Sequence, residues 1–302
     1  MALVPITTVA QYTSGTADHP EDGDDFEAAD VRAMFQVALD RAHFARGGLW
    51  GQLLWSGRFT VDPGGSSTVF AVKVGAISSL CVRDSSGTWR PYFVAAETTL
   101  DLGDVESSPA NLSNSTWYYV YAYSDGTSTL RFLINTTAPA ADLLWQSAGG
   151  DGLRRYLGCF RTNGSGAPIP VRAHRGRYLY RGSSITSGPV AATLTSIAAF
   201  ADVDLTAFLP PHARVAHLRA AILNTDTTSD HSVALRLRTN GDTTSYIEAV
   251  AHPGGASSSA ENAGRAHLTT ELETDGSQLI EAETAGTSAS FSAQIFCQGF
   301  TE

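Results

Sequence analysis

Residues 25–46 carry a helical pattern of apolar side chains. Acidic residues stand at the front of this segment, and Gly47 and Gly48 follow Arg46. Acids complement the positive end of a helix dipole, and glycine commonly ends a helix. We therefore predict an extended lead and one amphipathic helix within residues 1–48. Its apolar positions recur at spacings of three and four: Val31, Met34, Phe35, Ala38, Ala42 and Ala45.

Beyond residue 48 the apolar positions alternate with a period of two, which is the spacing of β-strands. The clearest hairpin covers residues 117–134, WYYVYAYSDGTSTLRFLI, with Asp125-Gly126 as its turn. A second hairpin is expected over residues 154–173, turning at Asn163-Gly164-Ser165-Gly166. Together with four shorter strand-like runs, they predict a small antiparallel β-domain over residues 49–181. The shorter runs are 66–74, 79–84, 88–95 and 98–102.

The chain composition changes at residues 182–190, GSSITSGPV, which we interpret as a linker rich in Gly and Ser. Six or seven further strand-like runs follow within residues 191–302, and the last alternates from Ala289 to Gln298 without a break. That spacing is typical of an antiparallel sandwich or a jelly roll. The expected fold class is mainly β: one N-terminal helix, a small antiparallel β-domain and a jelly-roll-like C-terminal β-sandwich.

Composition narrows the range of partners. The 302 residues are 43% hydrophobic and 17% charged, with a net charge of −10, and Lys73 is the single lysine. A chain with this negative net charge is poorly suited to bind the phosphate backbone of a nucleic acid, so we expect no nucleic-acid partner. No apolar run is long enough to cross a membrane, and the first residues lack the basic start of a secretory leader. We expect neither membrane insertion nor secretion.

The three cysteines, Cys81, Cys159 and Cys297, are odd in number and far apart, which argues against a disulfide framework and a Cys-x-x-Cys metal site. Each lies in an apolar run, so we expect free, buried thiols. His212 and His217 are five residues apart and would point to opposite faces of one strand, so they are not expected to chelate together. We therefore expect no metal and no other cofactor.

Signatures of catalysis are missing from the sequence. There is no Gly-x-Ser-x-Gly, no His-Glu-x-x-His and no phosphate-binding glycine loop followed by lysine. Paired carboxylates for glycoside cleavage are not recognisable from sequence alone. The tyrosines of residues 117–123 favour a packed core over a sugar-stacking platform. We expect a protein that is not an enzyme.

Strands that cross a sandwich alternate in direction, so every second loop emerges at the same end. By this reasoning the loops at 224–231, 252–265 and 285–287 share one tip of the C-terminal domain. Loops held on a rigid scaffold are where contacts with partners concentrate. The candidate contact residues at this tip are Asp226, Asp230, His231, His252, Glu261 and Asn262.

Residues 115–139, STWYYVYAYSDGTSTLRFLINTTAP, are followed at 154–181 by RRYLGCFRTNGSGAPIPVRAHRGRYLYR. This pair of segments resembles the middle region of tail-fibre and virion structural proteins of tailed bacteriophages. The polar residues 1–24, which end in an acidic cluster, and the predicted helix at 25–46 resemble the N-terminal region of the same proteins. The likeness covers about residues 1–180.

The resemblance implies a homotrimer that attaches to other virion proteins. The helix carries a seam that three copies could pack closely: Ala28, Val31, Phe35, Ala38 and Ala42. The alternative is a helix laid on its own β-domain, which Met34 and Phe44 favour because they lie off that seam.

The expected function is that of a structural component of a phage or phage-like virion, assembled in the host cytoplasm. A short tail fibre, or a fibre attached to the baseplate, would dock by its N-terminal part and present the C-terminal sandwich to the host surface. Tail, baseplate or capsid proteins are the expected partners, and a host surface glycan is a further candidate. The alternatives are a capsid decoration or head-fibre protein, a stand-alone carbohydrate-binding module and a tailspike depolymerase.

Overall fold

The computed structural model describes most of the chain from residue 58 onward. The predicted helix, with its seam Ala28, Val31, Phe35, Ala38 and Ala42, lies outside the described residues, as do Glu261 and Asn262. The described ranges are 58–63, 66–83, 89–124, 129–139, 145–148, 152–174, 176–181, 189–226, 228, 230–253 and 264–302.

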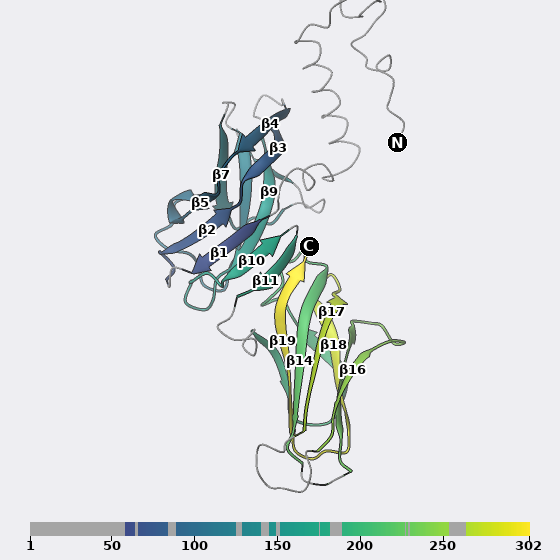
Figure 1. The fold of residues 1–302 in the computed structure, drawn as a ribbon. Helices are drawn as coiled ribbons and strands as arrows, with labels where there is room; N and C mark the ends of the chain where they lie inside the picture. The colour runs from purple at the N-terminus through teal and green to yellow at the C-terminus, as the bar shows by residue number, and fades with distance from the viewer. Residues whose placement is uncertain are drawn as a thin grey trace, which may run out of the picture.

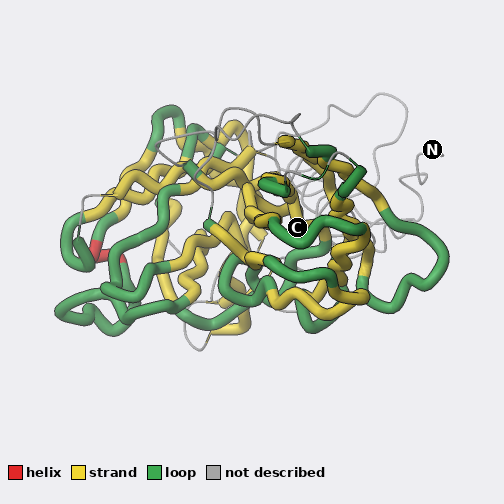
Figure 2. The backbone as a smooth tube through the Cα atoms, turned by 90° about the horizontal axis from the view of Figure 1, so that it is seen from below, coloured by secondary structure: helices red, strands yellow, loops and turns green. Residues whose placement is uncertain are grey.

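Strands dominate this part of the chain, so the prediction of a mainly β protein is confirmed. Figure 2 shows strands joined by loops, and the 3-10 helix η2 (Leu102–Asp104) is the one helical element among the described residues. In the first half the strands are β1 (Phe59–Pro63), β2 (Phe70–Val74), β3 (Ile77–Arg83), β4 (Trp89–Val94), β5 (Thr98–Leu100), β6 (Trp117–Ser124), β7 (Leu130–Asn135), β8 (Trp145–Ala148), β9 (Gly152–Arg161), β10 (Val171–His174) and β11 (Arg177–Tyr180). In the second half they are β12 (Val190–Leu194), β13 (Ala198–Asp204), β14 (Val215–Asn224), β15 (Val233–Thr239), β16 (Ile247–Ala251), β17 (Gly264–Glu273), β18 (Leu279–Gly286) and β19 (Phe291–Thr301).

The second half forms two facing layers. β12, β19, β14 and β17 lie in one layer, and β13, β18, β15 and β16 form the other, with every pairing antiparallel. Alternate residues of both layers are buried between them, among them Leu218 of β14, Leu235 of β15 and Ile280 of β18. Apolar alternation on each strand thus produces a sandwich-like core, as expected for aligned antiparallel sheets.

One sheet continues through both halves of the molecule. Its strand order is β17-β14-β19-β11-β10-β1-β2-β5, and β12 pairs with β19 beside β11. Figure 1 shows β19 reaching β11 where the two lobes meet, close to the C-terminal end of the chain. Tyr178 lies opposite Phe300 across this pairing, and their rings stack with centroids 4.4 Å apart. The two halves are therefore joined by backbone pairing and aromatic packing. The predicted domain boundaries at 181 and 191 stay a prediction.

The first predicted hairpin is confirmed. β6 pairs antiparallel with β7, from Tyr119 opposite Asn135 to Ser124 opposite Leu130. Its central residues, from Tyr118 to Ala122, are buried on both faces, and β6 is an inner strand of its sheet, between β7 and β9. The tyrosines at 119 and 121 pack in the core, as the sequence favoured.

The second predicted hairpin forms only at its turn. The Asn163 side chain accepts hydrogen bonds from the backbone N–H of Ser165 and of Ala167, each 3.0 Å long. Past a single bridge between Thr162 and Pro168, however, the chain leaves β9, and β10 pairs with β1 and β11. The backbone N–H of Ile169 still donates to the carbonyl oxygen of Arg161 at 2.8 Å. The carbonyl oxygen of Pro170 then accepts from the N–H of Arg181, so the chain passes from β9 to β11 at this point.

Candidate functional site

The distal tip of the sandwich is organised by a buried asparagine. Asn224 ends β14, has no exposed surface and contacts three loops. Its Nδ2 donates to the carbonyl oxygens of His231 and Ala251, at 3.1 and 3.3 Å. Its Oδ1 accepts from the Ser288 hydroxyl at 2.8 Å and from the backbone N–H of Asp226 at 3.0 Å. This residue therefore joins the ends of β14, β16 and β18, which brings together the described parts of the three predicted loops.

Asp226 is a fixed part of this tip. The backbone N–H groups of Ala289 and Thr228 each donate to its carboxylate at 2.9 Å, and His231 Nδ1 lies 2.9 Å from Oδ2. These bonds, the two backbone donors first, hold the pKa of Asp226 well below its usual range. Its carboxylate is thus committed to internal contacts that order the loop.

The other predicted tip residues are more accessible. Asp230 and His252 are exposed, whereas His231 is half-buried beside Asp226. The described candidates therefore divide into an internal pair, Asp226 and His231, and two side chains that face solvent. A partner at this tip would meet Asp230 and His252. Their role in contact stays a prediction.

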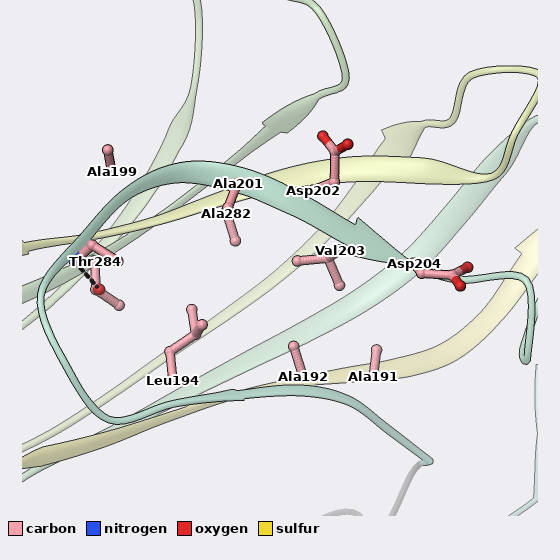
Figure 3. Close-up of a pocket in the computed structure, with 11 residues that line it drawn as sticks. Ala191, Ala192, Leu194, Ala199, Ala201, Asp202, Val203, Asp204, Ala282 and Thr284 are labelled. Atoms are coloured by element: carbon pink, nitrogen blue, oxygen red, sulfur yellow. Dashed lines mark hydrogen bonds between the residues drawn. The ribbon is translucent and has the colours of Figure 1, made fainter.

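The open side of the sandwich carries a shallow groove of about 220 Å³ between β12 and β13. Figure 3 shows Leu194 and Val203 pointing toward its centre from opposite walls. Both strands pair on one side only, and Val203 is the single buried residue of β13. Val190 and Ile197, at or beside these strands, remain 44% and 46% exposed. The wall is built mainly of small apolar residues: Ala191, Ala192, Ala198, Ala199, Ala201 and Ala282.

The outer face of the second sheet is covered by ion pairs. Arg236 of β15 lies 2.6 Å from Glu248 and 3.1 Å from Glu283, and Arg238 of the same strand pairs with Glu281. Glu281 and Glu283 are two residues apart on β18 and so share one face of it. Each of these two carboxylates is paired with an arginine of β15.

A polar cluster lies at the junction of the two halves. Cys159 and Tyr156 of β9 approach His212 and Glu302 there. Glu302 Oε1 lies 2.8 Å from His212 Nε2 and 3.5 Å from the Cys159 sulfur, and it accepts a short hydrogen bond from the Tyr156 hydroxyl. The side chains of His212 and Glu302 are each only 10% exposed. We call these four residues the junction cluster.

A β-bulge places two members of the junction cluster on one face. Residues three apart on a regular strand point to opposite faces, yet Tyr156 and Cys159 face the same way. Tyr121 lies opposite Tyr156 and Tyr119 opposite Cys159, so Leu157 is an extra residue in β9. Such a bulge redirects the side chains that follow it.

The loop between β13 and β14 carries His212 into the first half. Arg161 donates to the backbone oxygen of Ala207, and the Tyr180 hydroxyl donates to that of Phe208. These contacts anchor the loop against the first half. His212 then packs against the rings of Tyr119 and Tyr156, with centroid separations of 5.8 and 5.4 Å.

Burial controls the protonation of the junction cluster. It raises the pKa of Tyr156 and of the Cys159 thiol well above their usual values, and neighbouring acidic groups such as Glu302 add to the effect. Both groups are therefore protonated near neutral pH. His212 presents Nε2 to the cluster, while its Nδ1 is buried without a hydrogen-bond partner among the described residues.

Sequence reasoning anticipated some of these features and missed others. Cys159 and Cys297 are free and buried, as expected, whereas nothing is described of the Cys81 side chain. His212 and His217 do not meet: His212 contacts Glu302, and His217 Nε2 lies 2.8 Å from the Thr301 hydroxyl. The junction cluster was missed because its members are up to 146 residues apart and form no motif.

Near this cluster His217 adds a pH dependence. Burial lowers its pKa below the usual 6.5; Arg177 lowers it further, while Glu271 opposes. Below pH 6.5 the histidine of the unfolded chain takes up a proton that the buried His217 does not. The folded protein is therefore most stable, as far as His217 is concerned, above pH 6.5, and it loses stability as the pH falls. We expect His217→Gln to reduce the decline of Tm between pH 7 and pH 5. The exposed His174→Gln is the control, and equal declines in both variants would contradict the prediction.

No protein-family model matches this chain, and no curated protein matches it. Within the described residues, no helix has the length and apolar character that a membrane span requires.

Proposed function

We propose that the protein is a non-enzymatic structural component of a phage or phage-like virion. It acts as a short tail fibre, or a fibre attached to the baseplate, that docks by its N-terminal part and presents the distal tip to the host surface. The observation that carries this proposal is the antiparallel pairing of the described strands, together with the polar loops that Asn224 joins at one end of the sandwich. The likeness of residues 1–180 to tail-fibre proteins supports it.

The groove between β12 and β13 supports assembly with further copies of the chain, and the trimeric state is what the resemblance implies. Exposed apolar edge strands favour unwanted pairing, and proteins commonly cover them. Val190 and Ile197 are large exposed apolar residues on this edge, beside a wall of alanines that permits close approach. A neighbouring copy of the chain is the partner that a fibre supplies at this position.

The tip is tested with the full chain and a double variant, Asp230→Ala with His252→Ala. Both side chains are exposed, so we expect the variant to keep the trimeric mass and the Tm of the unchanged protein. Binding to host cells is expected to fall at least tenfold, because contacts presented by the tip are removed. The matched control is His174→Ala, an exposed histidine in the other half of the molecule.

Two measurements decide this test. Light scattering gives the mass of the full chain in solution, and labelled protein gives binding to host cells. A monomer that binds glycan would replace the proposal with a carbohydrate-binding module, and release of reducing ends from host polysaccharide would replace it with a depolymerase. Unchanged binding by the double variant, at unchanged mass, would remove the tip from the contact surface.

A further inference from the structure

We propose that Cys159, His212 and Glu302 bind a zinc ion that ties the two halves of the molecule together. Their donor atoms, one sulfur, one nitrogen and one oxygen, all lie within 4.8 Å of one another. They come from three separate segments: β9, the loop between β13 and β14, and the residue after β19. An ion bound here would crosslink both halves.

The spacing of the donors suits a tetrahedral ion. Zinc bonds of about 2.3 Å to sulfur and about 2.0 Å to nitrogen and oxygen separate the donor atoms by roughly 3.3–3.6 Å. The distance from Cys159 Sγ to Glu302 Oε1 is 3.5 Å. The distance from His212 Nε2 to the same oxygen is 2.8 Å, so these two atoms must separate by about 0.5 Å to admit the ion. Cys159 Sγ and His212 Nε2 lie within 4.8 Å of each other.

The charges of the donors also match zinc. When the ion binds, the S–H bond of Cys159 breaks, the zinc–sulfur bond forms and the proton goes to solvent. The thiolate, the Glu302 carboxylate and the neutral His212 imidazole then carry two negative charges, which balance Zn²⁺. A buried site with no net charge avoids most of the cost of burying an ion.

The donor set separates zinc from the common hard cations. Calcium and magnesium take oxygen ligands, whereas thiolate and imidazole are donors that zinc binds, and zinc also accepts a carboxylate oxygen. Tyr156 supports the site because its protonated hydroxyl donates to Glu302 Oε1 and holds the carboxylate in place. A water molecule completes the tetrahedron.

Cobalt and zinc binding test the proposal on the full chain in reducing buffer after dialysis against a chelator. When Zn²⁺ is added back and the excess is removed, we expect one Zn²⁺ per chain by elemental analysis. When Co²⁺ is added instead, we expect a sulfur-to-cobalt charge-transfer band. Zinc is expected to raise the Tm because it binds the folded chain. Cys159→Ser is expected to abolish the cobalt band, and His212→Gln and Glu302→Gln to weaken zinc binding at least tenfold.

Cys297→Ser is the matched control, since Cys297 is equally buried in β19 but is outside the junction cluster. It is expected to keep the cobalt band and the zinc stoichiometry. Absence of bound zinc together with absence of the band in the unchanged protein would overturn the proposal, as would a band that persists in Cys159→Ser. If Cys159→Ser does not fold, the stoichiometry and spectrum of the unchanged protein still decide.

Discussion

Gly299→Ala is expected to lower the free energy of unfolding by about 3 kcal/mol, at the upper end of the usual range for overpacking. A Cβ at this position would lie 1.9 Å from the backbone oxygen of Tyr178 and 3.0 Å from the Cα of Leu179. Both atoms belong to the backbone of β11, so no side chain can rotate away. β11 must instead move off β19, which disrupts the stacking of Tyr178 on Phe300.

Urea unfolding, followed by tryptophan fluorescence and circular dichroism, measures this effect. Gly276→Ala is the control, because a Cβ there meets no atom within 4 Å. Since Gly299 lies where the nine-stranded sheet crosses between the halves, we also expect the Gly299→Ala transition to broaden as the halves lose their coupling. An unfolding curve that coincides with that of Gly276→Ala would show that this backbone contact is not needed.

Asn224→Ala is expected to lower the free energy of unfolding by about 3 kcal/mol. The substitution removes four hydrogen bonds, each with a net contribution of about 1 kcal/mol, from a side chain without exposed surface. It also leaves the Ser288 hydroxyl and the Ala251 carbonyl in a buried space with fewer partners. The ends of three strands at the tip then lose their common anchor.

Asn224→Asp tests whether the amide donor matters, because aspartate has nearly the same shape. Its carboxylate keeps the acceptor for Ser288 but places negative charge against the carbonyl oxygens of His231 and Ala251. We expect it to be at least as destabilising as Asn224→Ala, whereas Asn111→Ala, an exposed control, should be neutral. Thermal unfolding compares all three, and a stable Asn224→Asp would argue against the donor role.

Prediction from sequence worked best where burial follows one face of a strand. β14 and β19 alternate as their apolar residues require, and β6 pairs with β7 in the predicted hairpin. It worked least well for β12 and β13, because the strand-like runs predicted in this half begin at residue 212 and leave both of them out. These strands are mostly exposed and rich in alanine, so their side chains produce little contrast between the two faces.

The residues of the candidate sites also differ in how far the sequence could identify them. Because strand direction alternates, the sequence could place Asp226 and His231 at one tip. It could not identify Asn224 as the anchor of that tip, since a polar residue after an apolar strand is common to most loops. The junction cluster was beyond sequence analysis, because Tyr156 and Glu302 meet across 146 residues.

The sequence by itself determined that this protein is built from strands, because alternation of apolar and polar residues allows burial on one face of a sheet. Only the tertiary structure decided how the halves join. A bulge at Gln298 shifts the register between β14 and β19, so Phe300 turns into the core and stacks on Tyr178. A second bulge at Leu157 directs Cys159 toward Glu302. A change of one residue in register reverses which face a side chain occupies, and that change depends on the neighbouring strand.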